Sequence, residues 1–241
     1  MEITKKYQLF VIEDNAQAIG AVYTYNNGKK AKAGTIGHVA STSFFPSKNL
    51  GCYGDGGAIF TNDDELAHTI RGIVNHGMYV RYHHDVVGVN SRLDSIQAAI
   101  LDIKLKHLDT YNKARQQAAR KYNAAFARHK KIVTPTGNSN CNGICDTCDC
   151  HVFHQYTLRV LDTDRDALAS HLNEKGIPCG VYYPIPLHLQ KAYTDSRYKE
   201  EDFEVTNQLV KEVISMPMHT ELDDEQIEFI AKTVINFIDQ N

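Results

Sequence analysis

A single lysine in a glycine-rich stretch carries the most specific chemistry of this sequence. The stretch runs from Ser41 to Gly57, reads S-T-S-F-F-P-S-K-N-L-G-C-Y-G-D-G-G, and contains Lys48, with Ser43 five residues before it. A lysine amine can bond an aldehyde, a serine hydroxyl can donate to a phosphate, and glycines let the backbone approach a ligand. The stretch therefore indicates a site for a phosphorylated aldehyde cofactor. The alternative, a surface lysine in a polar loop, is disfavoured by the apolar Phe-Phe-Pro run before it.

A carboxylate at the end of a predicted strand is the second candidate. Leu9 to Ile12 is a short apolar run that ends in Glu13 and Asp14, which indicates a buried parallel strand. Ligands of open α/β sheets bind at the carboxyl ends of the strands, so Asp14 is placed to meet a cofactor. From the residues alone, the alternative is that Asp14 caps a following helix.

Four segments resemble the pyridoxal-phosphate sugar aminotransferases of the DegT/DnrJ/StrS group, in the same order as in that group. They are V-I-E-D-N-A-Q-A-I-G-A at 11–21, S-F-F-P-S-K-N-L-G-x-x-G-D-G-G at 43–57, H-H-D-V-V-G-V-N-S-R-L-D-S-I-Q-A-A-I-L at 83–101 and Y-Y-P-I-P-L-H at 182–188. Because these segments span most of the chain, the resemblance is specific. It implies pyridoxal 5'-phosphate as the cofactor.

The resemblance also implies a role for each cofactor-binding residue. Lys48 would form the Schiff base with the cofactor aldehyde, and Asp14 would pair with the pyridine nitrogen and keep it protonated. Gln17 could reach the phenolic oxygen of the ring, and Ser43 would donate to the phosphate. Asn90 would reach the phosphate bound by the neighbouring subunit, which implies a homodimer with shared active sites.

Substrate binding is carried over onto Ser47, Arg92, Tyr183 and His188. Arg92 would contact acid or diphosphate groups, with a salt bridge to Asp94 or Asp85 as the alternative. Aromatic packing is the alternative for the tyrosines. In the group, a histidine often stands where this chain has the first tyrosine of Y-Y-P, which affects the expected sugar specificity.

The reaction implied is transamination of a nucleotide-linked keto-sugar. The expected nitrogen donor is an amino acid, glutamate by resemblance. The product would serve amino-sugar and cell-surface polysaccharide biosynthesis. Related sugar dehydratases have histidine at the position of Lys48, which argues against that activity. The second alternative is a noncatalytic or split-enzyme fragment that acts as a binding or regulatory protein. Its basis is that only ten residues precede Val11, whereas members of the group carry a long segment there; we therefore expect an N-terminal truncation.

The expected fold is the α/β fold of the aspartate aminotransferase-like, fold type I, enzymes. It would comprise a three-layer αβα large domain, incomplete at the N-terminus, in residues 1–125, and a small α+β domain in residues 126–241. Apolar residues from Leu93 to Leu108 form a wide helical stripe, which predicts a helix buried on two sides, including a subunit contact.

Three connecting segments have less regular patterns. Residues 22–35 predict a hairpin or a loop, with Asn27-Gly28 at its turn. The segment from Asn75 to Asp94, with the adjacent His83 and His84, predicts a loop rather than a metal site, because adjacent side chains rarely converge on one ion. Residues 178–182 are strand-like.

Four of the six cysteines lie in an insertion at 137–150. Their spacing, C-x3-C-x2-C-x-C, could supply soft ligands for a structural zinc ion or an iron–sulfur cluster, and reduced thiols on an exposed insertion are the alternative. The residues concerned are Cys141, Cys145, Cys148 and Cys150. We expect no catalytic metal, because aldehyde–amine chemistry needs none.

Composition excludes two classes of partner. The 241 residues are 42% hydrophobic and carry a formal net charge of −3, so no global field favours nucleic acid or anionic lipid. No apolar run is long enough to span a bilayer, and the first residues lack the apolar core of a signal peptide. These observations favour a cytoplasmic protein.

Overall fold

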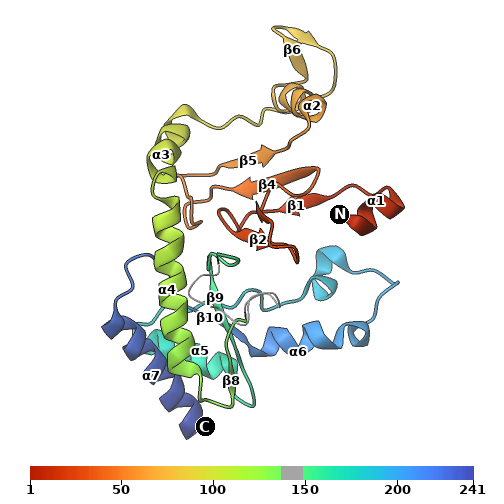
Figure 1. The fold of residues 1–241 in the computed structure, drawn as a ribbon. Helices are drawn as coiled ribbons and strands as arrows, with labels where there is room; N and C mark the ends of the chain where they lie inside the picture. Colours follow the sequence, from red (N-terminus) through yellow and green to blue (C-terminus); the bar gives the residue numbers. More distant parts are fainter. Residues whose placement is uncertain (137–148) are drawn as a thin grey trace. The chain divides into compact units, whose positions relative to one another are not determined.

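The structure, a computed structural model, describes residues 1–136 and 149–241 of the chain. Of these, residues 1–113 and 149–154 form a first compact unit, and residues 114–136 and 155–241 form a second. The long helix α4 (Leu108–Phe126) begins in the first unit and ends in the second (Figure 1). The domain boundary expected after residue 125 stays a prediction.

The first unit is built on a three-stranded sheet with the order β1-β4-β5 (Figure 1). The strands are β1 (Ile12–Asp14), β4 (Val39–Ser43) and β5 (Gly57–Phe60). β1 is parallel to β4, with Asp14 opposite Ser41, and β5 is antiparallel to β4. A parallel strand that ends at Asp14 is what the sequence predicts, although the strand begins later than the apolar run does. The predicted burial of this strand is wrong among the described residues, because Ile12 is 74% exposed.

One face of this sheet is covered and the other is open. Along β4, Ala40 and Thr42 are buried, whereas Ser41 between them is exposed. Successive side chains of a strand point to opposite faces, so Ser43 and Asp14 lie on the same face as Ser41. The open face therefore carries the polar side chains at the carboxyl ends of both parallel strands.

The hydrophobic core of the first unit gathers around the lysine segment. Its buried members are Phe44, Leu50, Cys52, Leu101 and Leu108. Phe44 and Leu50 stand on either side of Lys48 in the sequence. Because burying a large apolar side chain stabilises a fold by about 1.5–3 kcal/mol, these two residues fix both ends of the turn that contains Lys48.

Helix α3 (Ser95–Leu105) forms where the apolar stripe predicts it, but it is not buried on two sides. Leu101 is its one buried residue, and Ile96 and Ile103 are 75% and 63% exposed. The predicted second covered side is therefore an open apolar side in the part of the chain that the structure describes.

Two hairpins extend from the first unit. The predicted one is confirmed, with β2 (Val22–Thr24) antiparallel to β3 (Lys30–Lys32) and Gly28 at φ +80° in the turn. The loop expected after Asn75 is wrong in part, because β6 (Met78–Val80) pairs with β7 (His83–His84).

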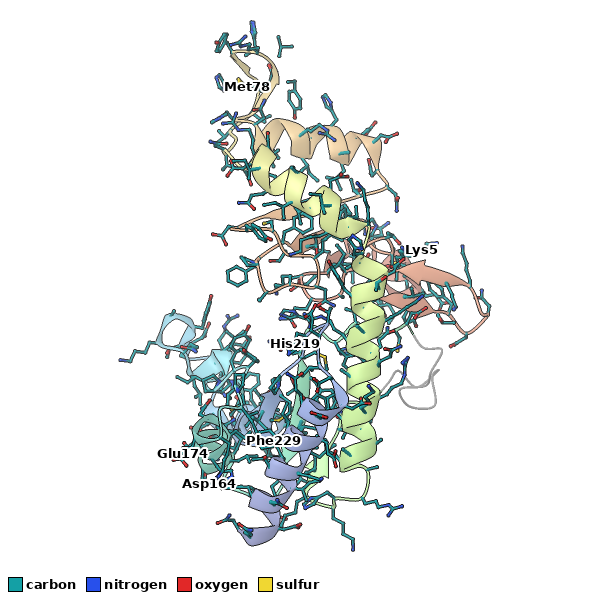
Figure 2. The ribbon with its side chains drawn as sticks, turned by 90° about the vertical axis from the view of Figure 1, so that its left-hand side faces the viewer. Lys5, Met78, Asp164, Glu174, His219 and Phe229 are labelled. Atoms are coloured by element: carbon teal, nitrogen blue, oxygen red, sulfur yellow. The ribbon has the colours of Figure 1, made fainter. Side chains whose placement is uncertain are left out.

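The second hairpin follows helix α2 (Asp64–Val74), which begins at Asp63 with its carboxylate accepting two backbone hydrogen bonds. Met78, labelled in Figure 2, begins β6 and pairs with His84, at the end of the hairpin away from its turn. The backbone places His83 and His84 side by side on a strand, and His84 Nδ1 donates to the carbonyl of His76 at 2.8 Å.

The second unit is a small antiparallel sheet with helices. Its strand order is β10-β9-β8, formed by β10 (Val213–Met216), β9 (Tyr156–Val160) and β8 (Ile132–Val133). Tyr156 stacks on Tyr122 of α4 with ring centroids 4.8 Å apart, and burial raises the pKa of both phenols. Its helices are α5 (Arg165–Glu174), α6 (Glu204–Glu212) and α7 (Asp224–Gln240).

Helix α5 shows why its bounds are readable from the sequence. At the start of the helix, the carboxylate of Asp164 accepts hydrogen bonds from the backbone N–H groups of Asp166 and Ala167. Gly176, at φ +73°, follows the end of the helix. Figure 2 labels Asp164 and Glu174 at the two ends. The segment 178–182, which the sequence predicts as strand-like, does not form a strand. Its pairing with the sheet among the described residues is an isolated antiparallel bridge between Gly180 and Ser215. Three 3-10 turns follow at Leu187–Leu189, Lys191–Tyr193 and Glu200–Phe203.

The cysteine-rich insertion lies largely outside the described residues. This applies to Cys141, Cys145 and Cys148, so the proposed metal ligands among them stay a prediction. Cys150 is described and is disulfide-bonded, which differs from the expected metal ligand or reduced thiol. Within residues 1–136 and 149–241, no helix is long and apolar enough to cross a membrane.

Candidate active site

The carboxyl edge of the parallel strands brings the first candidate residues together. Asp14 ends β1 and Ser43 ends β4, and both belong to the open face of the sheet. Asp14 is exposed and Ser43 is half-buried. Because parallel strands end at one edge, the edge combines a carboxylate and a hydroxyl in one place.

Asp14 does not cap a helix. Its Oδ1 accepts the backbone N–H of Ala16 at 3.0 Å, but residues 16–20 form turns. Among the described residues, no donor reaches the second oxygen, Oδ2. The helix-cap alternative is therefore wrong, and a carboxylate oxygen stays available to a ligand. Gln17, in the same turn, is exposed.

Lys48 occupies a tight turn directly after β4. Its backbone N–H donates to the carbonyl of Phe45 at 2.8 Å, and the N–H of Phe45 donates to Ser43 Oγ at 3.2 Å. The chain then folds back over this turn, where a Cβ on Gly51 would collide with the carbonyl oxygen of Pro46. Only glycine permits that close approach.

Helix α3 holds the glycine segment that follows Lys48. Lys104 Nζ donates to the carbonyl of Gly51 at 2.5 Å, and Gln97 Oε1 accepts the N–H of Tyr53 at 2.7 Å. Both contacts bind backbone groups, so they fix the path of the loop whatever its side chains are. The lysine motif does not predict a role for Gln97 or Lys104. The signal in the sequence is their position four residues before and three residues after the buried Leu101, which places them on the same side of the helix.

The donor set at this edge fits pyridoxal phosphate. Lys48 offers an amine for the aldehyde, Asp14 an exposed carboxylate for the ring nitrogen, and Ser43 a hydroxyl for the phosphate. Gln17 adds an amide that can donate to the phenolic oxygen.

Asn90 and Arg92 lie at a different place in the first unit. They line a hollow of about 950 Å³ along β5 and α2, together with Ser41 and Arg71. Arg92 Nε donates to Asn90 Oδ1 at 2.9 Å, and no ion pair joins Arg92 to Asp85 or Asp94, all of which are described. The salt-bridge alternative is therefore wrong.

Lys48 and Asp14 do not line this hollow. Ser41, which pairs with Asp14 across the sheet, does line it. The expected reach of Asn90 to a neighbouring subunit stays a prediction.

The remaining substrate residues divide between the units. Ser47 is exposed in the turn before Lys48. Tyr183 is 69% exposed in the second unit, and His188 stacks on Phe203 with ring centroids 4.3 Å apart. The roles of Tyr183 and His188 at the cofactor stay predictions.

Glu13 was not singled out by the motif, although it stands beside Asp14. Its carboxylate accepts the backbone N–H groups of Gly34, Ile36 and Gly37 at 2.5–2.8 Å. Burial raises the pKa of this carboxyl, but the three hydrogen bonds outweigh burial and the net pKa is lowered. Glu13 and Asp14 alternate along β1, so one ties down the 34–37 loop and the other faces the open side.

The sequence matches the DegT/DnrJ/EryC1/StrS aminotransferase family over residues 1–235. It is 46% identical over 237 residues to a "Pleiotropic regulatory protein" of Geobacillus stearothermophilus, covering 98% of this chain and 60% of that protein. It is 44% identical over 234 residues to the UDP-2-acetamido-2-deoxy-3-oxo-D-glucuronate aminotransferase of Pseudomonas aeruginosa, covering 97% and 60%. The chain therefore spans about 60% of the length of these relatives.

Solved structures give the same result for the fold. DesV of S. venezuelae superposes with a TM-score of 0.86 at 36% identity, covering 98% of this chain and 60% of that chain. NtdA of Bacillus subtilis, with bound PMP, superposes with a TM-score of 0.82 at 27% identity, covering 99% and 52%. The expected α/β fold of the pyridoxal-phosphate aminotransferases is confirmed.

The lysine turn, the carboxylate edge and the match over residues 1–235 have one explanation. The chain belongs to the DegT/DnrJ/EryC1/StrS aminotransferase family, whose members depend on pyridoxal phosphate.

Proposed function

We propose that this chain takes part in transamination of a nucleotide-linked keto-sugar, with an amino acid, glutamate by expectation, as the nitrogen donor. The observation that carries the proposal is the arrangement of Lys48 directly after β4, with Asp14 and Ser43 at the carboxyl edge of its parallel strands. The names of relatives, such as the UDP-keto-sugar aminotransferase of Pseudomonas aeruginosa, support the substrate class.

Bound pyridoxal phosphate supplies an electron-withdrawing ring that accepts the electrons of a broken C–H bond. Asp14 holds a proton on the ring nitrogen, because an anion at that position favours the protonated form. Ser43 binds the phosphate, and Gln17 orients the ring through its oxygen.

Lys48 has two tasks in this proposal. Its amine would hold the cofactor through the aldehyde. When free, the amine would accept a proton from the donor and return it, as general base and then general acid. The turn anchored by Phe44 and Leu50 keeps the amine within reach during both half-reactions.

Substrate recognition is assigned to Ser47, Arg92, Tyr183 and His188. A guanidinium suits the diphosphate of a nucleotide sugar, because it can donate two parallel hydrogen bonds to phosphate oxygens. Tyrosine and histidine suit sugar hydroxyls and the nucleobase. We assign the reaction to the cytoplasm and to amino-sugar synthesis for cell-surface polysaccharides.

A homodimer with shared active sites is part of the proposal. The hairpin arm, defined as residues 78–89, exposes the apolar side chains of Val80, Tyr82, Val86, Val87 and Val89. The open side of α3, with Ile96 and Ile103, adds to this apolar surface within the same unit. Exposed apolar surfaces of this kind support a subunit contact, which would carry Asn90 to the partner.

An absorbance scan tests the proposal most simply. The purified chain is mixed with pyridoxal phosphate, and a new visible absorbance band is expected that Lys48→Ala lacks. Isotopically labelled nitrogen from glutamate should then appear in a nucleotide keto-sugar. Binding without a band and without nitrogen transfer would contradict the proposal.

A noncatalytic regulatory role is the second candidate. It is favoured by the name of the Geobacillus relative, a "Pleiotropic regulatory protein". The same experiment separates the two functions. A regulator would bind the nucleotide sugar without transferring nitrogen, and its Lys48→Ala variant would keep the same affinity for the nucleotide sugar.

A further inference from the structure

Two buried asparagines connect the lysine segment with the rest of the first unit. Asn49 directly follows Lys48, and its side chain is 7% exposed. Its Nδ2 donates to Asn112 Oδ1 and to the carbonyl of Val152, both at 2.8 Å. Both amide hydrogens are therefore used, and the residue after Lys48 is tied to helix α4 and to the segment 149–154.

Asn112 makes a second contact on the other side. It is 5% exposed, and its Nδ2 donates to the carbonyl of Ile19 at 3.1 Å. Ile19 lies in the turns that follow Asp14. One side chain thus binds the segment after the ring-nitrogen carboxylate and the segment that contains the lysine.

The backbone at Gly20 is shaped for this contact. Gly20 has a φ of +87°, and a Cβ at this position would lie 2.5 Å from Asn112 Nδ2. A side chain here would displace the amide from Ile19, and the positive φ also disfavours any residue other than glycine. The close approach of the two segments to Asn112 is therefore built into the fold.

We propose that Asn112 is a positioning residue that fixes the distance between the Asp14 segment and the Lys48 segment. This inference rests on the proposed function, because the distance matters only if both residues hold one cofactor. Asn112 does not touch reacting atoms in this proposal. It acts through Asn49 on one side and through Ile19 on the other.

A purely structural role for the pair makes a different prediction. A buried polar pair that only stabilises the core would loosen the whole unit when it is cut. A positioning role predicts that only the segments bound by the substituted asparagine loosen. Removal of Asn112 loosens both segments, whereas removal of Asn49 loosens the lysine segment alone.

Amide hydrogen exchange of the full chain without cofactor measures this directly. The reporting amides include Ala18 and Ala21 on the Asp14 side, and Lys48 and Cys52 on the lysine side, all of which donate to backbone carbonyls. Asn112→Ala should speed exchange in both segments roughly three- to tenfold, as for the loss of one buried hydrogen bond. Asn49→Ala should do so in the lysine segment only.

Asn123→Ala is the matched control. Asn123 lies on the same helix but in the second unit, where its Oδ1 accepts the hydroxyl of Tyr156 at 2.6 Å. It should leave both segments unchanged. With added pyridoxal phosphate, Asn112→Ala should shift the pH midpoint of the cofactor's absorbance change, and Asn123→Ala should not.

The inference would be overturned if Asn112→Ala left the exchange rates on the Asp14 side unchanged. It would also be overturned if the amides of β4 exchanged faster by the same factor as those of the two segments. If Asn112→Ala does not fold, Asn112→Asp decides the question. It keeps the acceptor for Asn49 and loses the donor to Ile19, so the Asp14 side alone should loosen; loosening of the lysine side instead would refute the inference. Failure of the unmodified chain to bind the cofactor would contradict the proposed function, and the exchange data would still decide on the asparagines.

Discussion

At the scale of single residues, the two neighbouring acids of β1 divide their work by the alternation of the strand. Asp14 faces the open side of the sheet with one carboxylate oxygen available among the described residues. Glu13 points the other way and accepts three backbone N–H groups from the 34–37 loop. Two acidic residues, one position apart, therefore face the open side of the sheet in one case and stabilise a loop in the other.

Glu13→Gln is expected to destabilise the first unit at neutral pH. Because the pKa of Glu13 is lowered in the folded chain, its stabilisation is complete above its ordinary pKa of 4.5 and is lost as pH falls through the folded value. The free energy of unfolding should fall by about 1 kcal/mol at pH 7, since solvent screens part of the effect. The difference between the two chains should shrink below about pH 4.5.

Urea unfolding at a series of pH values measures this difference. Glu65→Gln, at an exposed position in the first turn of α2, is the matched control. A Glu13→Gln deficit that grows as the pH falls would have the wrong sign and would refute the assignment.

Asp14→Asn is expected to lower the rate of transamination roughly 10²–10⁴-fold, because the ring nitrogen loses the anion that keeps it protonated. Trapping of pyridoxal phosphate on Lys48 should persist, since the lysine turn is intact. Steady-state rates and borohydride trapping of the same preparations measure the two effects. Asp102→Asn, which removes an exposed partner of Lys106, is the control and should change neither.

The candidate residues differ in how far the sequence reveals them. The sequence predicts Lys48, Asp14 and Ser43 as candidates from their residue types, their spacing and their positions near strand ends. Asn112 does not, because a buried amide on a helix shows no pattern until the turns that it binds are known. Contacts 63 and 93 residues away, to Asn49 and Ile19, are set by the tertiary fold.

At the scale of elements, the hairpin arm and α3 give the first unit two apolar surfaces that the described residues do not cover. Val87 is 97% exposed at the arm, and Ile96 is 75% exposed on α3. Because Asn90 follows the arm directly, a partner subunit that covers these surfaces would also receive Asn90.

Mixed dimers are expected to recover activity from two inactive variants. In a mixed dimer with shared sites, both substitutions fall in the same site, because the Asn90→Ala chain contributes its altered residue to the site of the Lys48→Ala chain. The other site keeps Lys48 and Asn90, so a mixed dimer should recover up to about half of the activity of the unmodified dimer. Nitrogen transfer before and after mixing is the measurement, and mass spectrometry of the intact dimers shows that subunits exchange. Exchange without recovery would place Asn90 and Lys48 in one site of one chain.

Elements with a clear local signal can be predicted from the sequence. The hairpin at 22–35 follows from Asn27-Gly28. The short strands β6 and β7 do not, because their alternation is too brief and too polar to stand out. For α3, an apolar stripe predicts a covered surface but not which chain covers it, so the predicted subunit contact stays a prediction.

At the scale of the whole molecule, the motifs predicted the fold class, and the comparisons confirm it. The sheet of the first unit has an open face on which Ile12 and Ile59 are 74% and 49% exposed. The chain spans about 60% of the length of its relatives, and an uncovered sheet face with apolar residues is where further chain could pack. No local pattern in the sequence encodes such packing, because it depends on segments far away or on other chains.

The central claim is that Lys48 is the residue that bonds the cofactor aldehyde. Incubation with pyridoxal phosphate, reduction with borohydride and peptide mapping measure this directly, even where binding is weak. We expect the cofactor mass on the peptide that contains Lys48, its loss in Lys48→Ala, and its retention in Lys106→Ala, which removes an exposed lysine of the same unit. Cofactor attached to another lysine, or at equal levels in Lys48→Ala, would contradict the account.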